Sequence, residues 1–477
     1  MGHSPMPSLL RYMVNYLLLG SLRTAFGLDL DSLVPLLSPA STVEGRGSTP
    51  PRWSEFGAPT AGGVVHPATE EDVQKTLKWA VDRKVPFLVE NGANGWATTL
   101  HLKEDGIVIA LDLLRFVTFS ADNRLVTVGG GALTSDVTSA GYSAGALVAT
   151  GTCNCVGFLG AALGGGIGYL TGEYGLGVDS FVSLNIVRAD GTSETLTKTS
   201  GELFWALRGA APNFAIVTSA VILAHPVTNE NPATAWTGAL VFASTQIDQV
   251  LQTIANLRLD PRSALSMTWV SSKGTPRIIV TVFYHGTEDA GRALFAPLFS
   301  RGPVSDSTAT RPYTAWNAGG DNACVKGGYK PTWGVGLAKF EPRSWRAVYD
   351  VWVDLTRETG TANSSVLLTV YPMERSRRLP PDSAAYPFRN DINYFASFTA
   401  SFSDLSLEQT ALAHGRKARE LWQATDGLTR HSTYINNAFG DESLVTVYGD
   451  HLEFLRELKR KYDPHCRFDQ WFPLSRK

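Results

Sequence analysis

The pattern that most constrains this chain is a glycine-rich stretch from Gly151 to Gly168, GTCNCVGFLGAALGGGIG. Seven of its eighteen residues are glycine, and most of the others are aliphatic, whereas flexible linkers are rich in polar residues. Glycine permits positive φ angles and lets backbone N–H groups converge on an anion. The stretch alone fits two structures equally well: a cradle for a dinucleotide, or a packed glycine hairpin.

Length and composition indicate a large protein without an obvious macromolecular partner. A chain of 477 residues exceeds one ordinary hydrophobic core and predicts two domains or one composite fold. The formal net charge of −2 gives no electrostatic reason to expect nucleic acid as a partner. No apolar stretch approaches the length of a membrane span, so we expect no membrane partner. We also expect a monomer that acts on a small molecule.

The four cysteines, Cys153, Cys155, Cys324 and Cys466, are too few and too scattered to predict a disulfide scaffold. The Cys-x-Cys pair lacks the second pair, or the histidines, that a zinc site requires, so no metal site is predicted. We therefore interpret Cys153 and Cys155 either as small buried hydrophobic residues or as including one reactive thiolate.

The N-terminal residues 12–20, YMVNYLLLG, have the length of the apolar region of a signal peptide. Asn15 interrupts them, and no small-x-small cleavage site follows. We interpret them as an N-terminal helix and favour a cytoplasmic over a secreted location, although the sequon at Asn363 is compatible with secretion.

The first half of the chain alternates strands, helices and glycine loops. Thr69 followed by three acidic residues predicts a helix N-cap, and Val73, Leu77 and Ala80 then fall on one helical face. A strand at 85–89 enters a second glycine loop at 90–96. Further elements are expected at 106–111, 125–129, 181–187 and 192–196 (a hairpin), 202–209 (a helix) and 211–218.

The second half has a different texture, with alternating strands and longer amphipathic helices. Strands are predicted at 236–242, 265–270, 277–283, 365–370 and 393–402, and helices at 344–358, 450–462 and 407–424, the last capped by Ser406. This pattern predicts a sheet with helices on one face. We expect an N-terminal helix and loop at 1–50, a first domain at 51–226, a second at 227–430, and a return of 431–477 to the first domain.

In this order the motifs resemble the berberine-bridge-enzyme-like branch of the vanillyl-alcohol-oxidase, or PCMH-type, FAD family. The match spans nearly the whole chain from about residue 50. Each motif is weak alone, but the ordered set is specific: TEEDV at 69–73, GTCNCVG at 151–157, LGGGIG at 163–168, WALRG at 205–209, NFAIVT at 213–218, YIN at 434–436 and KYDP at 461–464.

The resemblance implies an α+β fold. A PCMH-type FAD-binding domain of two α/β subdomains would form from both chain ends, with an inserted substrate domain of antiparallel sheet covered by helices. No Gly-x-Gly-x-x-Gly follows an early strand, so a Rossmann site is not expected. The implied FAD contacts are Glu90, Asn91, Gly92, Ala93, Asn94 and Gly95 at the pyrophosphate; Thr152, Cys153, Val156, Gly157, Gly160, Gly164, Gly165 and Gly168 beside the flavin; and Asn213, Ala215, Val217 and Asn436.

One departure from the family pattern concerns covalent attachment of the flavin. Relatives often carry Gly-Gly-His in the first loop, and that histidine bonds to the flavin 8α carbon. Here the matching positions hold Ala93 and Asn94, and asparagine cannot form that bond. The second family anchor, a cysteinyl link at flavin C6, matches Cys153, so the flavin is either held by one bond or not covalent. Without the histidyl link we expect a poorer oxidant.

A second departure removes a catalytic base. Relatives often read Tyr-x-Asn-Tyr near the C-terminus, and the last tyrosine can act as a base. The matching residue here is Asn437, which does not titrate. Candidate catalytic positions are therefore Tyr371, Tyr434 and Asn437, with Glu374 as a further carboxylate. Each tyrosine has the alternative of being a buried packing residue, and Glu374 that of a solvated carboxylate.

These observations predict an FAD-linked oxidase or dehydrogenase of secondary metabolism. It would act on a small, hydrophobic, natural-product-like molecule by hydride transfer to flavin N5, with O2 as the acceptor. The alternative is a cyclase or isomerase that binds FAD without net redox chemistry, and a third reading is an inactive flavin-binding protein. No nucleophile elbow supports a hydrolase.

Overall fold

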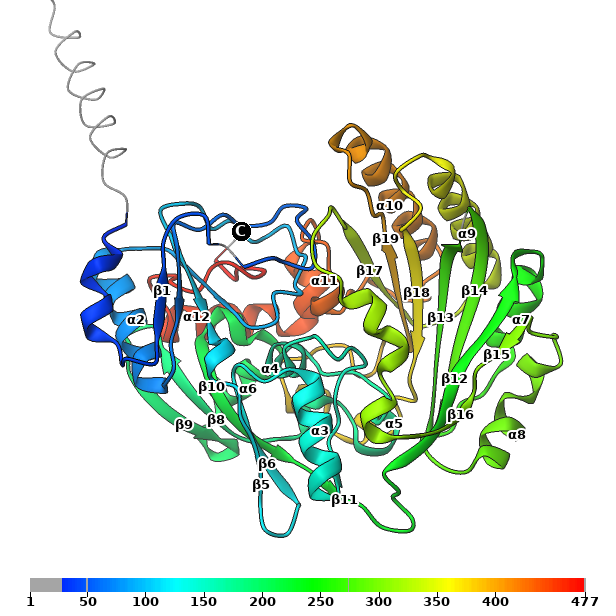
Figure 1. Cartoon of the computed structure of the whole chain (residues 1–477), viewed down its shortest axis with the longest axis horizontal. Coiled ribbons are helices and arrows are strands. Elements are labelled where there is room, and N and C mark those ends of the chain that lie inside the picture. Colours follow the sequence, from blue (N-terminus) through cyan, green and yellow to red (C-terminus); the bar gives the residue numbers. More distant parts are fainter. Residues whose placement is uncertain (1–27, 49, 273, 476–477) are drawn as a thin grey trace, which may run out of the picture.

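The computed structural model describes residues 28–48, 50–272 and 274–475. It has two lobes side by side, one with several small sheets and one built on a single large sheet (Figure 1). The helix expected around residues 12–20 lies outside the described residues. Among the helices of the described ranges, none is long and apolar enough to cross a membrane.

The N-terminal part of the first lobe is a small sheet covered by one helix. Its strand order is β1-β2-β4-β3; β2, β4 and β3 run parallel, and β1 is antiparallel to β2. Helix α2 begins after Thr69 with a capping box, in which Thr69 and Asp72 exchange side-chain and backbone bonds. The bounds are β1 Thr42–Glu44, β2 Gly63–His66, α2 Glu70–Arg83, β3 Phe87–Glu90 and β4 Ile107–Ala110.

A five-stranded antiparallel sheet forms the rest of this lobe, in the order β5-β6-β10-β8-β9. The predicted hairpin is present as β8 and β9, and β6 has the predicted bounds. The elements are β5 Val117–Phe119, β6 Leu125–Gly129, α3 Thr134–Ala144, α4 Phe158–Leu163, α5 Thr171–Tyr174, β8 Phe181–Arg188, β9 Ser193–Thr197, α6 Glu202–Ala210 and β10 Ala215–Leu223; a separate pair joins β7 Ala146–Leu147 to β11 His225–Pro226.

The second lobe is an antiparallel sheet in the order β15-β12-β14-β13-β18-β19-β17, with β16 also paired to β12. Figure 1 shows helices along its outer face, where a tryptophan-rich core forms. The bounds are β12 Thr234–Ala243, α7 Ile247–Asn256, β13 Ser263–Ser272, β14 Thr275–Tyr284, α8 Glu288–Phe299, β15 Ser305–Asp306, β16 Ala309–Pro312, β17 Thr332–Leu337, α9 Pro342–Arg357, β18 Ser365–Val370, β19 Tyr394–Thr399 and α10 Glu408–Gln423.

The expectation that Ser406 caps α10 is wrong. A 3-10 turn at Leu405–Leu407 precedes the helix, so the N-cap position falls on Leu407. The Asp404 side chain instead accepts a bond from the Ser406 N–H and caps the turn. The helical pattern located α10 but did not reveal the extra turn before it.

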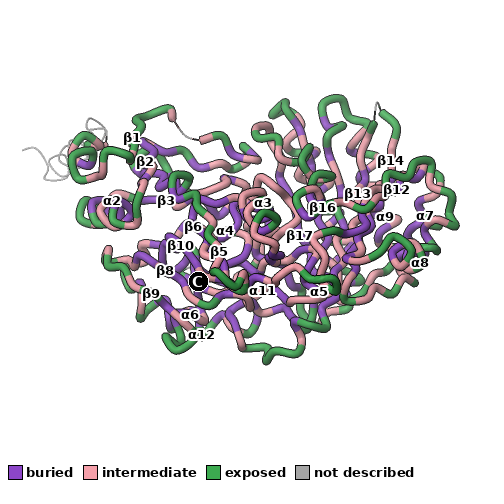
Figure 2. Tube along the Cα trace, turned by 60° about the horizontal axis from the view of Figure 1, so that its bottom comes forward, coloured by how far each residue is buried: buried purple, intermediate pink, exposed green. Residues whose placement is uncertain are grey.

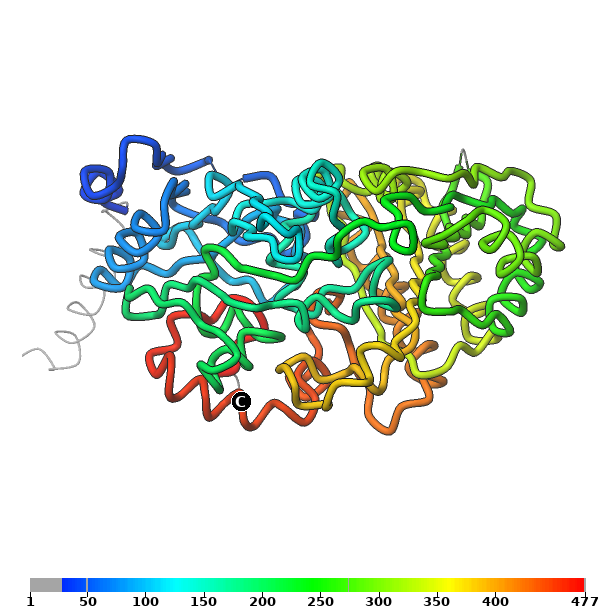
Figure 3. Tube along the Cα trace, turned by 90° about the horizontal axis from the view of Figure 1, so that it is seen from below, coloured from blue at the N-terminus to red at the C-terminus, as the bar shows by residue number. Residues whose placement is uncertain are grey.

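The C-terminal segment returns to the first lobe. Helix α11 (Leu444–Tyr448) and helix α12 (Leu452–Tyr462) precede the last described residues, and α12 packs against α6. The buried Lys459 Nζ donates to the carbonyls of Asn213 and Phe468 and pairs with Asp463. Figure 3 shows the red C-terminal segment beside the green strands of the first half, so both chain ends build one lobe.

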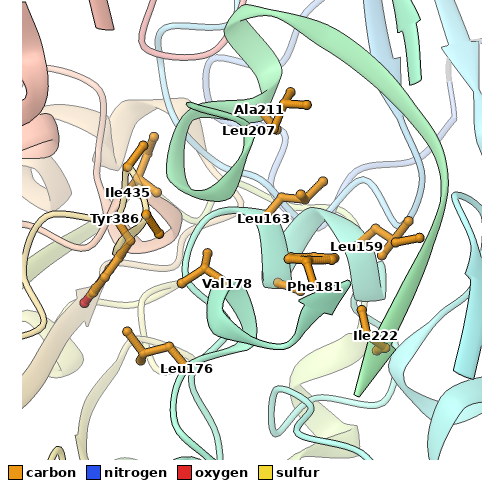
Figure 4. Packing of buried hydrophobic residues seen from close by; sticks show 14 of the residues in the cluster. Leu159, Leu163, Leu176, Val178, Phe181, Leu207, Ala211, Ile222, Tyr386 and Ile435 are labelled. Carbon is orange, nitrogen blue, oxygen red and sulfur yellow. The ribbon is translucent and has the colours of Figure 1, made fainter. Parts of the chain in front are cut away.

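One buried cluster connects the two lobes. Figure 4 shows Leu159 and Leu163 of α4 surrounded by Val178, Phe181 and Leu207, with Ile435 from the C-terminal segment close by. Phe283 and Phe395 of the large sheet, and Tyr371 directly after β18, belong to the same cluster, and Figure 2 shows buried residues in purple in both lobes. The domain boundaries at 50, 226 and 430 stay a prediction, although the three larger sheets do use separate stretches of the chain.

Candidate cofactor and active site

The stretch Gly151–Gly168 folds as a turn, a short helix and a glycine turn, and not as a hairpin. The Val156 N–H bonds to the Cys153 carbonyl, α4 follows, and Gly165 and Gly166 then adopt φ of 152° and 70°. At Gly166 a Cβ atom would lie 2.7 Å from the Gly177 Cα atom. Glycine is required here because the backbone combines positive φ with a close approach of another segment.

The loop at 90–96 is fastened to this stretch by asparagines. The Asn94 amide donates to the carbonyls of Gly92 (2.9 Å) and Cys155 (3.1 Å), and the Asn91 amide donates to the Ala132 carbonyl. Arg52 forms a buried ion pair with Glu90 and donates to the Gly95 carbonyl. Asn94 therefore holds two glycine loops together at the position where relatives are expected to carry histidine.

Free backbone donors line the same loop. In the described chain, no backbone carbonyl accepts a hydrogen bond from the N–H groups of residues 92–96. Adjacent N–H groups in a glycine loop form a site for phosphate oxygens. Cβ atoms added at Gly151 and Gly160 would meet nothing within 4 Å, so the backbone there faces open space. These residues fit a dinucleotide pyrophosphate and a flat ring beside it.

Tyr434 braces the glycine turn. Its hydroxyl accepts bonds from the Gly166 N–H (3.2 Å) and the Asn436 amide (2.7 Å), and Asn436 also donates to the Ala161 carbonyl. A Cβ at Gly164 would collide with Asn436. Burial raises the pKa of Tyr434 to about 12, although these two hydrogen bonds act to lower it. This tyrosine is therefore a neutral acceptor at ordinary pH.

Aromatic side chains cluster beside the stretch, and they come from β14, from the end of β18, from the 3-10 turn Tyr313–Ala315 and its next residue, and from Tyr169. Tyr169 stacks on Phe283 with ring centroids 4.3 Å apart, and Trp316 packs on Phe283 and Tyr313. Tyr371, at the end of β18, is buried beside Cys153, and burial raises its pKa above the ordinary range despite a hydrogen bond with Thr152. We call Tyr169, Phe283, Tyr313, Trp316 and Tyr371 the aromatic wall.

Cys153, the first residue of the turn, carries a free and half-buried thiol. Burial raises its pKa, and the charge of Asp321 raises it further, whereas a hydrogen bond with Thr152 lowers it. The reading of Cys155 as a small hydrophobic residue or a thiolate is wrong, because Cys155 forms a disulfide with Cys324. The partner lies 169 residues away, and no local pattern marks it.

The remaining predicted site residues have structural contacts or none that mark a ligand. The Asn213 amide donates to the Tyr448 hydroxyl and to the carbonyls of the C-terminal segment, and its oxygen accepts from the Leu474 N–H. Ala215 and Val217 are buried on β10, and Val156 is half-buried. Asn437 is half-buried beside Gly334 of β17, and Glu374 is exposed.

Sequence reasoning missed Tyr169 and Phe283 as site residues. Tyr169 directly follows Gly168, so its position was a usable signal. Phe283 was read only as part of an alternating strand. Its stacking on Tyr169 depends on the fold bringing β14 against the segment between the glycine stretch and α5, which no local pattern predicts.

The two-lobed α+β fold, with a glycine-rich stretch packed beside aromatic side chains, is that of a PCMH-type flavoprotein. The chain belongs to a family of FAD-linked oxidoreductases. A family model described as an FAD binding domain matches residues 61–197. The FAD-linked oxidoreductase OXR1 of Pyricularia oryzae is 33% identical over 427 residues, which cover 87% of this chain and 84% of that protein.

Solved structures agree on the fold. A xylooligosaccharide oxidase from Myceliophthora thermophila superposes with a TM-score of 0.80 at 20% identity, covering 94% of this chain and 99% of that one. A berberine-bridge-enzyme-like protein from Physcomitrella patens gives the same TM-score and the same coverage at 18% identity. The protein is thus an FAD-linked oxidoreductase with the expected α+β fold.

Proposed function

We propose that this enzyme oxidises a small, uncharged and largely hydrophobic molecule, passing a hydride to flavin N5 and the electrons onward to O2. The observation that carries this proposal is the composition of the surface facing the glycine stretch. Side chains alternate between the two faces of a strand. On the face of β12, β14, β13, β18, β19 and β17 opposite the helices, Arg277 is the only charged residue within these strands.

The open part of this face combines hydroxyl and aliphatic groups. Thr268, Ile279, Thr281 and Thr369 are half-buried, and Leu367 is 36% exposed. An antiparallel sheet can leave one face open in this way. Such a surface suits a flat molecule with few hydrogen-bonding groups, because a charged substrate would lose its hydration without gaining a partner.

FAD would be held by this chain's own backbone and thiol. The N–H groups of 92–96 would bind the pyrophosphate, and Gly164–Gly168 with Thr152, Val156 and Gly157 would lie along the flavin. Bound FAD supplies the two-electron chemistry. Cys153 is the only residue we propose as a covalent anchor, and acid precipitation tests it: yellow colour should stay with the wild-type pellet and leave it in Cys153→Ala. Release from the wild type would exclude the bond.

Tyr371 would orient the substrate by donating a hydrogen bond. Burial keeps its phenol neutral, so it would act as a donor and not as a base at ordinary pH. The Tyr434 hydroxyl is already hydrogen-bonded to the glycine turn. We propose that it supports catalysis indirectly, by holding that turn in position. Asn437 would contribute at most a polar contact, since an amide does not take up a proton.

The alternative function is cyclisation or isomerisation with FAD retained but not reduced. The asparagines at positions 94 and 437 favour it, because both replace groups that support oxidation in relatives. Anaerobic mixing with substrates drawn from aromatic and terpenoid alcohols separates the two. Bleaching of the flavin absorbance supports oxidation, whereas product formed with the flavin still oxidised would sink the first proposal.

The location and assembly of the enzyme are also proposals. Disulfides persist in oxidising compartments and are rare in the cytosol. The Cys155–Cys324 bond therefore leads us to propose such a compartment in place of the cytoplasmic location favoured from the sequence. We retain the monomer as the working assembly, and light scattering of the purified protein tests it.

A further inference from the structure

A segment of the second lobe, which we also call the sheet lobe, crosses to the first lobe near the loop at 90–96 and the stretch Gly151–Gly168. Residues 318–330, which we call the crossing strap, contain the 3-10 turn Ala318–Cys324. The strap is bound to residues 52–55 of the first lobe by backbone and side-chain hydrogen bonds. These are Trp53 Nε1 to the Ala323 carbonyl (2.7 Å), Gly327 N–H to the Arg52 carbonyl (2.9 Å), Glu55 N–H to the Gly328 carbonyl (2.9 Å) and Lys330 N–H to Ser54 Oγ (3.0 Å).

The strap is also tied to the turn that contains Cys153. Residues 153–156 form this turn, and both of its central residues are attached to the strap. The Asn154 amide donates to the Asp321 carboxylate at 2.7 Å, and Cys155 is bonded to Cys324. On the other side, the Asn94 amide holds the Cys155 carbonyl and the Ser135 N–H holds that of Asn154. Of this turn's two thiols, only Cys153 remains free.

Three cysteines thus meet at one place, and only one pairing leaves the thiol beside the aromatic wall available. Asp321, three residues before Cys324, accepts a hydrogen bond from the amide of Asn154, the residue next to Cys153, so the strap passes beside this thiol. A thiol and a disulfide that share one turn can exchange partners. Pairing of Cys324 with Cys153 would consume the proposed flavin anchor.

We propose that the Cys155–Cys324 disulfide keeps the Cys153 thiol free for the flavin, because Cys324 is already paired and cannot form a disulfide with Cys153. We call this effect the reservation of Cys153. The functional benefit of this pairing rests on the proposed Cys153 anchor. The pairing preference itself does not, because it can be measured without FAD. In the exchange that the strap opposes, the Cys153 thiolate would attack Cys324 Sγ and Cys155 would leave as a thiolate. The S–S bond moves and no electrons are gained or lost.

Cys155→Ser tests the reservation because it frees Cys324. With oxidised glutathione as oxidant, the Cys153 and Cys324 thiols would give up two electrons and two protons, forming their disulfide and two reduced glutathiones. Peptide mapping without reduction should find 155–324 in the wild type and 153–324 in Cys155→Ser. Covalent flavin fluorescence in a denaturing gel should fall roughly tenfold or more in that variant, since the anchor thiol is oxidised.

The double variant Cys155→Ser/Cys324→Ser is the matched rescue, and Cys466→Ser is the control for loss of an unrelated thiol. Covalent flavin should return to near the wild-type level in the double variant, with far-UV circular dichroism confirming that each variant is folded. A Cys153 thiol that stays alkylatable in oxidised, folded Cys155→Ser would overturn the inference. If Cys155→Ser forms the 153–324 bond but the wild type releases its flavin in acid, the reservation of Cys153 is supported and only the proposed covalent anchor is wrong.

Discussion

At the scale of single residues, the site is defined as much by what Asn94 and Cys153 replace or retain as by the glycines. Asn94 uses its amide to join the first loop to the Cys155 carbonyl, which is a structural role. Cys153 keeps a free thiol, but its surroundings disfavour the thiolate. Any bond to the flavin must therefore form from a thiol that is mostly protonated at neutral pH.

The rate of covalent attachment should consequently rise with pH. The pKa of Cys153 lies above its ordinary value, so the thiolate fraction increases about tenfold per pH unit until that pKa is reached. Adding FAD to the apoprotein between pH 7 and 9 and following acid-stable flavin measures this rate. A rate independent of pH would show that deprotonation of Cys153 does not limit the reaction.

Tyr434→Phe should destabilise the protein by roughly 0.5–1.5 kcal/mol, because the Gly166 N–H and the Asn436 amide would lose one buried acceptor while each keeps its bond to the Ala161 carbonyl. Chemical denaturation measures the loss. Tyr142→Phe is the matched control. Tyr142 is 47% exposed, so loss of its hydroxyl should change the free energy of unfolding little. Equal stability of the two variants would contradict the bracing role.

At the scale of elements, sequence patterns located what local chemistry determines. The bounds of β6 and β18 were predicted to the residue, because alternation and flanking turn residues mark both ends. The helix within Gly151–Gly168 was not predicted, since its glycines obscure the helical period. Cys155 and Phe283 depend on partners far along the chain, and no local pattern contains that information.

The capping box of α2 gives a pH-dependent prediction. Burial would raise the pKa of Asp72, but hydrogen bonds from Ser38, Thr69 and Ser41 lower it to about 2. Because the folded pKa is depressed, the stabilisation is present above about pH 4 and is lost as pH falls toward 2. Asp72→Asn should cost about 2 kcal/mol at neutral pH, with the difference shrinking over that acidic range.

Urea denaturation of both proteins from pH 2 to 7 measures this difference. The control is Asp82→Asn on the same helix, whose exposed pair with Lys78 should leave stability nearly unchanged. A difference for Asp72→Asn that stays constant down to pH 2 would contradict the role of the ionised carboxylate.

At the scale of the whole molecule, the two lobes are joined by buried polar contacts as well as by the shared core. Arg389 of the sheet lobe makes two bonds to Asp179 of the first lobe, at 2.9 and 3.0 Å, and both side chains are buried. Near the aromatic wall, His285 contacts the Glu173 carboxylate and the Pro232 carbonyl. The position of the wall relative to the glycine stretch depends on these contacts.

Asp179→Asn should destabilise the protein by roughly 3–5 kcal/mol, because it leaves the Arg389 charge buried without its partner. Thermal denaturation measures the loss. Asp450→Asn, which breaks an exposed pair with Arg430, should give no measurable change. Comparable losses from the two variants would show that burial of the Arg389–Asp179 pair does not matter.

The central claim, that FAD lies along Gly151–Gly168, is tested most directly by a crystal structure of the enzyme with its cofactor. We predict pyrophosphate oxygens within hydrogen-bonding distance of the N–H groups of 92–96. We also predict the flavin ring between Gly164–Gly168 and the aromatic wall, on the side of Cys153. A flavin found elsewhere, or a pyrophosphate bound by other groups while those N–H groups stay free, would contradict the account.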